Sequence, residues 1–331
     1  MFADDIDGRH GTLFKRLVLW FDSRTAEQGV FDCLMQVVRK LASLIYLLAL
    51  LGFAGCGGNE ITNKGAEFRI VQDDLGRSVK LPGKVERVVS LAPSLTESIY
   101  AVGAGDKLVG VTTYCNYPEA ATAKEKVGDT QTPNIERIVA LKPDVVFVST
   151  ASQLEAFMKT LEQQNIGVYV MDAKGIDEVL ADLSILGEML GSDEATESLV
   201  LDLTERVRAV ENRNLHGAQP KRVFVQFSKV PLFTIGKDSF LTEVVSKASG
   251  ESVTKDVPTA FPPLSNETAY ALDPDVIILS DSEDNREPNA VFKNSNAVRN
   301  GRVYRINADI ISRPGPRLVD ALEQISEFLR K

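Results

Sequence analysis

Two glutamates occupy matching places in two similar stretches of the chain. Glu136 lies in NIERIVALKPDVVFVS and Glu267 lies in NETAYALDPDVIILS, and each stands seven residues before a proline that is followed by aspartate. The glutamates are 131 residues apart (267 − 136 = 131), as are the two prolines. An acid in the first turn of a helix favours the helix dipole, which accounts for either glutamate alone. A catalytic carboxylate pair must lie close together, so acids repeated in two halves of a chain are better suited to docking onto two matching basic sockets.

Short apolar runs alternate with helical patterns around both glutamates. In the first half, strands are expected at 87–91, 107–112, 144–149 and 167–172, and helices at 134–141 and 153–165. In the second half, a strand at 222–227 and a helix at 239–250 precede the Glu267 unit, and a strand at 301–307 follows it. Ser94 and Glu97 have the spacing of a capping box at the start of another helix. This alternation predicts parallel sheets with helices on their faces.

A stretch without glycine or proline lies between the two halves, at residues 193–214. Its apolar residues recur at three- and four-residue spacings, which predicts one long amphipathic helix. The expected fold class is therefore α/β, with two doubly wound lobes and parallel-type sheets joined by one long helix. The lobes are expected at 79–192 and 215–331.

Composition argues against several functions. The net charge is −9, which disfavours nucleic acid as a partner. The chain has only two histidines, His10 and His216, and three cysteines, which leaves little material for a histidine-based metal site or catalytic triad. No Gly-rich phosphate loop follows a strand, and no G-x-S-x-G motif occurs. An enzyme is therefore the less favoured class, and a binding protein the favoured one.

The N-terminal region has the segments of a secretory signal. Basic residues after Met35, an apolar run and small residues ending in FAGC occupy residues 35–55 and the following Cys56. The ending resembles a bacterial lipobox, so Cys56 is expected to carry lipid and to anchor the protein to a membrane at its periplasmic or extracellular face. Residues 1–34 match no part of a signal, and we expect them to be a non-native extension before the true start. Residues 56–78 are expected to form a tether and lead-in; an uncleaved membrane anchor is the alternative.

Several longer motifs resemble a known family. RVVSLAPSLTESIYAVGAGDKLVGVTTYCNYP, ERIVALKPDVV and SRPGPRLVDALE are similar to segments of the substrate-binding proteins of bacterial ABC importers. The resemblance covers about Val79 to the C-terminus and is strongest to cobalamin-binding members of a family that also serves ferric siderophores and haem. It implies a monomer that binds its ligand between two lobes and delivers it to a permease dimer with ATPase subunits. In this family an acid on each lobe contacts permease arginines, and Glu136 and Glu267 match those acids.

The resemblance also implies ligand contacts in three segments and no other cofactor or metal. These contacts are Tyr114, with Tyr117 as a substitute, in TTYCNYP; Thr130 in GDTQTPN and Phe261 in PTAFPPLS; and Asp309, Ile310, Ile311, Ser312 and Arg313 in NADIISRPGPR. The family pattern has tryptophans where this chain has Thr130 and Phe261. Pro314 and Pro316 stiffen the last loop and fix Arg313 and Arg317, whose side chains suit the amides of a corrin or an anionic siderophore equally. A ferric siderophore is thus the main rival ligand, and haem is another because a tyrosine can serve as its axial ligand.

Overall fold

The structure is a computed structural model that describes residues 68–149, 155–214 and 219–331. Gly65–Lys331 form one compact unit. The expected signal at 35–55, Cys56 and residues 1–34 lie outside the described residues. Within the described ranges, no helix is long and apolar enough to cross a membrane.

The first lobe is built on a five-stranded sheet in which all neighbouring strands are parallel. Its order is β5-β4-β3-β6-β7. The strands are β3 (Val88–Ser90), β4 (Leu108–Val111), β5 (Glu125–Lys126), β6 (Val145–Ser149) and β7 (Gly167–Met171). The helices between them are α3 (Pro93–Ala101), α4 (Ile135–Ala140) and α5 (Glu155–Gln163).

Successive strand residues of this sheet face two different hydrophobic cores. In β6, Val145 and Phe147 belong to the core that α3 and the following helix α6 (Ile176–Leu190) also enter. Val146 and Val148 belong to a second core that contains Ile138 of α4 and side chains of α5. Helices therefore cover both faces, which explains why these strands are apolar throughout.

A small hairpin precedes the first sheet. Strands β1 (Phe68–Gln72) and β2 (Ser78–Pro82) pair antiparallel, and β2 packs beside β7. Leu81 is fully buried there. Sequence patterns predict no strand before residue 87, so the β1–β2 hairpin is an addition to the expected fold.

The second lobe repeats the plan of the first. Its sheet has the order β10-β8-β11-β12 with parallel neighbours, and β9 (Phe233–Thr234) pairs antiparallel with β8. The other strands are β8 (Lys221–Ser228), β10 (Gly250–Ser252), β11 (Val276–Asp281) and β12 (Val303–Asn307). The helices are α8 (Phe240–Lys247), α9 (Asn266–Leu272), α10 (Asn296–Arg299), α11 (Ala308–Ile311) and α12 (Leu318–Arg330). Alternate residues of β8 and β11 again face two different cores.

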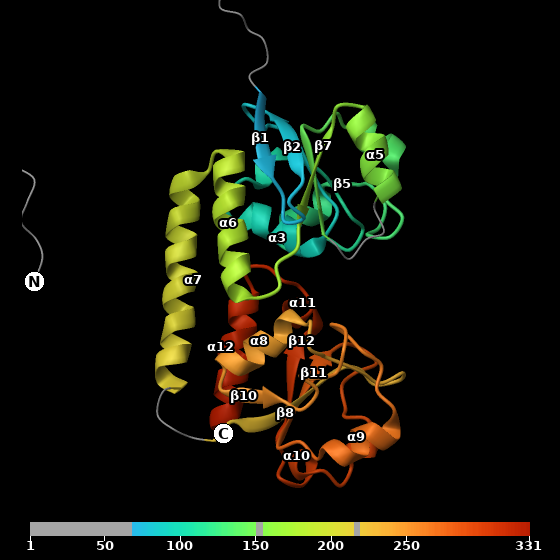
Figure 1. The fold of residues 1–331 in the computed structure, drawn as a ribbon, viewed down its shortest axis with the longest axis vertical. Helices are drawn as coiled ribbons and strands as arrows, with labels where there is room; N and C mark the ends of the chain where they lie inside the picture. The colour runs from blue at the N-terminus through green and yellow to red at the C-terminus, as the bar shows by residue number, and fades with distance from the viewer. Residues whose placement is uncertain (1–67, 150–154, 215–218) are drawn as a thin grey trace, which may run out of the picture. The chain divides into compact units, whose positions relative to one another are not determined.

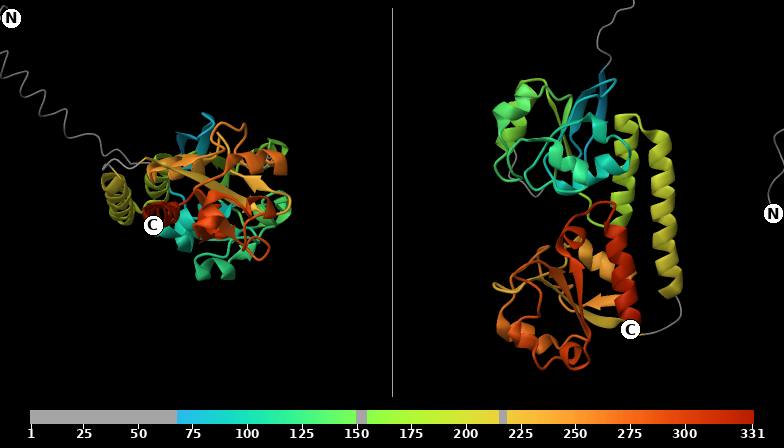
Figure 2. Two further views of the ribbon diagram at one scale, coloured as in Figure 1. Left: turned by 90° about the horizontal axis from the view of Figure 1, so that it is seen from below. Right: turned by 180° about the vertical axis from the view of Figure 1, so that it is seen from behind.

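Long helices pack beside both sheets. Helix α7 spans Asp193–Asn214, the range predicted from the sequence, and lies side by side with α6 (Figures 1 and 2). Gly191 between them has φ +65°, a left-handed conformation that glycine adopts without strain. Helix α7 also packs against α12 of the second lobe. One hydrophobic core includes residues of α6, α7, α8 and α12, so it runs through both lobes.

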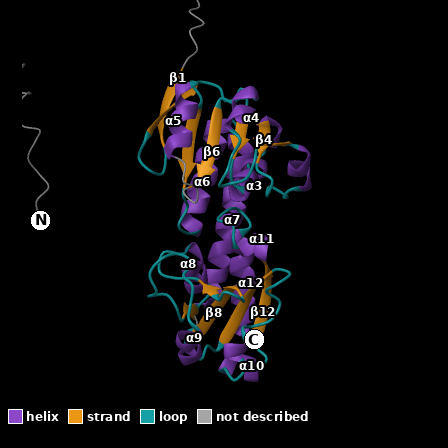
Figure 3. Ribbon diagram, turned by 90° about the vertical axis from the view of Figure 1, so that its right-hand side faces the viewer, coloured by secondary structure: helices purple, strands orange, loops and turns teal. Residues whose placement is uncertain are grey.

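The structure confirms the α/β class, the two lobes and their parallel sheets. Figure 3 shows strands in each lobe flanked by helices. The prediction of a Ser94–Glu97 capping box is wrong. The N-cap of α3 is Ala92, which makes no side-chain capping hydrogen bond, and the Glu97 side chain is buried.

Candidate functional site

Glu136 and Glu267 stand at equivalent places in two equivalent helices. Both are the second residue of their helix, α4 or α9, and both side chains are exposed. Asn134 caps α4 by accepting a hydrogen bond from a backbone N–H of the first turn, and Ser265 caps α9 in the same way. Capping fixes the start of each helix, so the two glutamates extend from equivalent positions in equivalently capped first turns.

The turns after these helices are also duplicated in detail. Arg87 donates from Nη2 to the Leu141 carbonyl over 2.6 Å, and Arg222 donates from Nη2 to the Leu272 carbonyl over 2.6 Å. Each arginine thus satisfies a carbonyl at the C-terminal end of a helix, where helical partners are missing. The residue before each proline, Lys142 or Asp273, has a positive φ in both lobes.

The aspartates of the two Pro-Asp pairs have a structural role. Asp144 Oδ2 accepts from the backbone N–H of Arg87 over 2.8 Å, and Asp275 Oδ2 accepts from that of Arg222 over 3.0 Å. Each aspartate therefore ties its helix–turn–strand unit to the neighbouring strand. The repeat is a packing unit, and the exposed glutamate is the part that packing does not require.

The surroundings of the two glutamates differ. Arg137 follows Glu136 and lies 3.6 Å from Glu125, whereas Tyr270, 69% exposed, lies one turn after Glu267. Neither Glu136 nor Glu267 forms an ion pair with any of the residues that the structure describes. Both glutamates are thus exposed, one on α4 of the first lobe and one on α9 of the second, two helices labelled in Figure 3.

A second candidate site lies where loops of the two lobes meet. The loop after β4 is anchored by Cys115, which is 1% exposed and has its Sγ 3.1 Å from both Thr96 Oγ1 and Thr112 Oγ1. With Cys115 inside, its neighbours point outward: Tyr114 is 61% exposed and Tyr117 is 47% exposed. The two predicted tyrosines therefore present their rings at the surface.

The facing loop of the second lobe runs from α11 to α12. Asn307 caps α11 by accepting from the backbone N–H of Asp309 over 2.8 Å. Gly315 approaches the first lobe so closely that a Cβ there would lie 3.3 Å from the Ser94 carbonyl oxygen. Gly315 is therefore in close contact with the start of α3.

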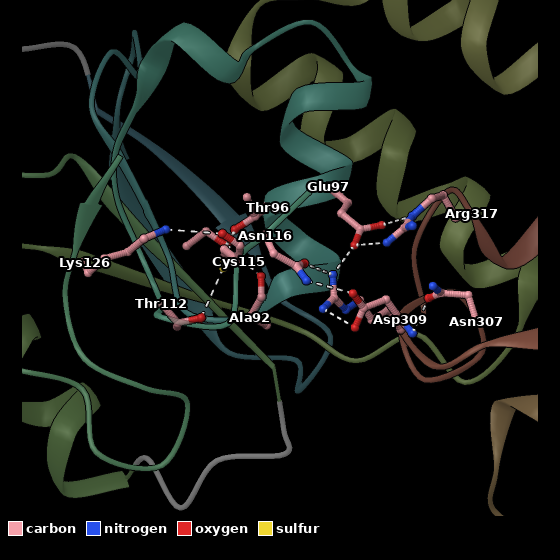
Figure 4. Close-up of polar contacts among 12 residues, drawn as sticks. Ala92, Thr96, Glu97, Thr112, Cys115, Asn116, Lys126, Asn307, Asp309 and Arg317 are labelled. Carbon is pink, nitrogen blue, oxygen red and sulfur yellow. Dashed lines mark hydrogen bonds and ion pairs between the residues drawn. The ribbon is translucent and has the colours of Figure 1, made fainter. Parts of the chain in front are cut away.

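Glu97 joins these two loops. Its carboxylate accepts from Arg317 Nε and Nη2 and from Arg313 Nη1, each over 2.7 Å (Figure 4). The side chain of Glu97 is 2% exposed, and those of Arg313 and Arg317 are 10% and 19% exposed. Charge-assisted bonds of this kind are among the strongest in proteins, and the paired Nε and Nη2 donors fit one carboxylate.

Two further contacts complete this cross-lobe network, which consists of Glu97, Asn116, Asp309, Arg313 and Arg317. Asn116 donates from Nδ2 to Asp309 Oδ2 and accepts from Arg313 Nη1, both over 2.8 Å, and Arg313 Nη2 donates to Asp309 Oδ1 over 2.6 Å. The Arg317 guanidinium also lies over the Tyr117 ring, 4.0 Å from its centre. One face of Tyr117 is thus covered, while Tyr114 makes no hydrogen bond to any described residue.

Glu97 raises the pKa of Arg317. Burial alone lowers the pKa of Arg317, but the hydrogen bonds and the charge of Glu97 outweigh burial, so its pKa lies above the ordinary value. Two carboxylates and two guanidinium groups make the cross-lobe network neutral as a whole.

The remaining predicted ligand residues are placed less uniformly. Phe261 is 37% exposed and packs on Phe227, with ring centres 4.7 Å apart. Thr130 is half-buried in a turn that Asp129 holds by accepting from the backbone N–H of Thr132 over 2.6 Å. Ser312 is exposed and Ile310 is half-buried. Ile311 is fully buried in the core, so its assignment as a ligand contact is corrected: it anchors the α11 segment.

The sequence interpretation missed the main role of Glu97. A charged residue among the apolar positions of SLTESIY is unusual unless it is paired, and two arginines in SRPGPR supply the partners. That signal was present, but the capping-box spacing offered a local explanation. Among the described residues, no group of three His, Cys, Asp or Glu side chains could hold a metal ion.

Comparison with known proteins agrees with this architecture. The family model described as periplasmic binding protein matches residues 88–310. The chain belongs to the periplasmic binding protein family. Proteins of this family bind solutes. The vitamin B12-binding protein of Vibrio cholerae is 33% identical over 251 residues, which cover 75% of this chain and 91% of that protein.

Two further relatives support the family assignment. The uncharacterized ABC transporter substrate-binding lipoprotein YvrC of Bacillus subtilis is 30% identical over 86% of this chain and 94% of its own length. The crystal structure of the periplasmic vitamin B12-binding protein BtuF of Vibrio cholerae matches with a TM-score of 0.66 at 32% identity, covering 74% of this chain and 97% of that chain.

Proposed function

We propose that this periplasmic binding protein is the extracytoplasmic substrate-binding component of an ABC importer and that it captures cobalamin or a related corrinoid. The observation that carries the proposal is the contact between two predicted ligand segments from different lobes. Asn116, between the two exposed tyrosines, bonds to Asp309 and Arg313 of the second lobe. Relatives named for vitamin B12 binding, at 32–33% identity over most of the folded part, support the same ligand.

The side chains at this contact suit a large flat ligand with polar edges. The exposed Tyr114 ring offers a face on which a corrin can stack, and Phe261 of the second lobe, packed on Phe227, is the other aromatic ring that we assign to the ligand. A site of a few aromatic rings with fixed polar groups is typical of small-molecule recognition.

The two exposed glutamates are assigned to the permease. A dimeric permease presents the same basic socket twice, and Glu136 and Glu267 offer one acid from each of two equivalent helices. Their exposure and lack of an ion-pair partner among the described side chains support an intermolecular role.

Attachment to the membrane through lipid on Cys56 completes the proposal. Two acyl chains anchor a protein stably, whereas one chain holds it weakly. Replacement of Cys56 by Ser is expected to move the protein from the membrane fraction to the soluble fraction. Retention in the membrane after this change would favour an uncleaved N-terminal anchor.

A ferric siderophore or haem is the second candidate ligand. The phenols of Tyr114 and Tyr117 are both exposed, and a tyrosine oxygen can ligate iron.

Gel filtration of the full chain after mixing with cyanocobalamin tests the proposed ligand. The corrin absorbance is expected to elute with the protein at about one ligand per chain. Elution of free cobalamin, together with retention of haem or a ferric siderophore in parallel runs, would replace the corrinoid by the second candidate.

A further inference from the structure

Arg313 and Arg317 lie at the proposed ligand surface, and carboxylates of the protein already balance their positive charges. Glu97 accepts three hydrogen bonds from them, and Asp309 accepts one from Arg313. The four charged side chains have a net formal charge of zero. Glu97 contributes the most buried carboxylate, at 2% side-chain exposure, against 36% for Asp309.

The arginines nevertheless keep unused hydrogen-bond donors. A guanidinium carries five N–H groups, and Arg317 uses only Nε and one N–H of Nη2 toward Glu97. The two N–H groups of Nη1 and the second of Nη2 have no partner among the described residues. The side chain is 19% exposed, so part of it reaches solvent. What remains for a ligand is therefore a set of donors without a net charge.

This combination distinguishes two kinds of ligand. An amide carbonyl needs a donor and no counter-charge, so it can bind beside an intact Glu97–Arg317 pair. A carboxylate needs a positive charge, so it must either displace Glu97 or lie near it, and like charges in a poorly solvated place repel strongly. Displacing Glu97 would also leave its carboxylate buried and unpaired.

We propose that Glu97 is a specificity-determining residue that neutralises Arg313 and Arg317, so that the site accepts ligands with amide side chains and rejects ligands with carboxylate side chains. This inference rests on the proposed function, since it concerns the same ligand surface. Glu97 acts through the two arginines and is a positioning residue. From the sequence alone, Arg313 and Arg317 suit the amides of a corrin and an anionic siderophore equally. The proposed role of Glu97 favours the corrin amides.

The test uses two corrin probes that differ only in charge, and haem as a third probe. One probe is cyanocobalamin; the other is the same compound after hydrolysis of side-chain amides to carboxylates. Each is titrated into the full chain, and thermal unfolding is followed with each probe because a ligand raises the melting temperature of the form it binds. The wild-type protein is expected to prefer the amide form over the carboxylate form by at least about tenfold.

Three variants separate specificity from stability. Glu97→Gln keeps the shape but removes the charge, and it is expected to reverse or abolish the preference and to gain stability from haem and the carboxylate corrin. Glu97→Asp keeps the charge and should keep the preference. Glu323→Gln is the matched control: Glu323 holds Arg206 of α7 by bonds of 2.7 and 3.1 Å, and its loss should leave the preference unchanged.

A purely structural role for Glu97 would weaken both corrin probes alike, which would overturn the inference. Equal binding of the carboxylate and amide forms by the wild-type protein would also overturn the inference. This measurement is made on the wild-type protein alone, so it does not depend on the folding of any variant. Should the wild-type protein bind no amide corrin, the proposed ligand fails. The inference still stands or falls on whether Glu97→Gln binds the two anionic probes more tightly than wild type. If Arg317→Gln in the Glu97→Gln background left that gain intact, the arginine would not be the group that Glu97 controls.

Discussion

The two candidate sites of this protein place their glutamates in opposite ways. The helix–turn–strand unit occurs twice, and in both copies the glutamate is exposed. The nearby arginines, Arg87 and Arg222, bond to backbone carbonyls. The cross-lobe network occurs once, and Glu97 is buried under two arginines of the other lobe. The exposed, repeated glutamates are suited to binding an external partner, whereas the buried Glu97 holds the two lobes of the protein together. Position relative to solvent, more than residue type, therefore decides what each glutamate can do.

Replacement of Glu97 by Ala is expected to have the largest effect. It leaves two poorly exposed guanidinium groups without their main counter-charge, and breaking a buried pair from one side costs about 3–5 kcal/mol. The free energy of unfolding, measured by urea denaturation, should fall by that amount. Glu136→Ala, at an exposed position, should change it by less than about 0.5 kcal/mol. Equal effects of the two changes would remove the distinction between the surfaces.

Replacement of both Glu136 and Glu267 by Ala should act on the transporter and not on the ligand. Acid–arginine pairs desolvated at an interface cost about 2–5 kcal/mol when one side is truncated. Binding to the reconstituted transporter and uptake should fall sharply, while ligand affinity and melting temperature stay nearly unchanged. The matched control is the double change of Glu197 and Glu205, exposed acids of α7, to Ala. Lost ligand affinity with intact docking would reverse the assignment.

Truncation of the exposed aromatic residues should weaken ligand binding moderately. Loss of a stacked ring costs about 0.5–1.5 kcal/mol beyond area burial, so Tyr114→Ala and Phe261→Ala should each lower corrinoid affinity several-fold in calorimetric titration. Tyr270→Ala removes an equally exposed tyrosine beside Glu267 and should leave this affinity unchanged. If neither Tyr114 nor Phe261 mattered, the ligand surface would lie elsewhere.

Asp182 of α6 is a half-buried acid that forms no ion pair with a basic side chain among the described residues. Burial raises its pKa to about 7, and the charges of Asp74, Glu178 and Asp172 add to the rise. The folded state then binds more protons than the unfolded state, so this residue makes stability fall as the pH rises from about 4 to about 7. Partial exposure reduces the size to about 0.5–1 kcal/mol.

Asp182→Asn should remove this pH dependence. The variant is expected to match wild type near pH 4 and to become more stable relative to it toward pH 7, in urea denaturation at a series of pH values. A constant difference across that range would show that Asp182 does not titrate there.

Much of the architecture follows from patterns that are local in the sequence. The apolar runs of β6 and β11, the interlobe helix and the repeat around Glu136 and Glu267 are all visible without coordinates, because strands covered on both faces and amphipathic helices have distinct periodicities. Both strands of the β1–β2 hairpin were missed, and among the described strands β1 pairs with β2 alone.

The ligand surface was predictable only in part. The tyrosine loop and the 309–317 loop could be named by resemblance, but their contact joins residues nearly 200 positions apart, as in the bond between Asn116 and Asp309. No local pattern reports such a contact. The spacing of Ser94 and Glu97 favoured a helix cap, and burial of Glu97 against Arg313 and Arg317 prevailed because two guanidinium groups offer it stronger bonds than one backbone N–H.

A crystal structure of the protein with cyanocobalamin tests the division between the two surfaces most directly. The corrin is expected against Tyr114, with Arg317 donating to a side-chain amide while it keeps both bonds to Glu97, and with Glu136 and Glu267 free of ligand. A corrin bound beside Glu136 or Glu267, or an Arg317 that has left Glu97 to reach the ligand, would contradict the account.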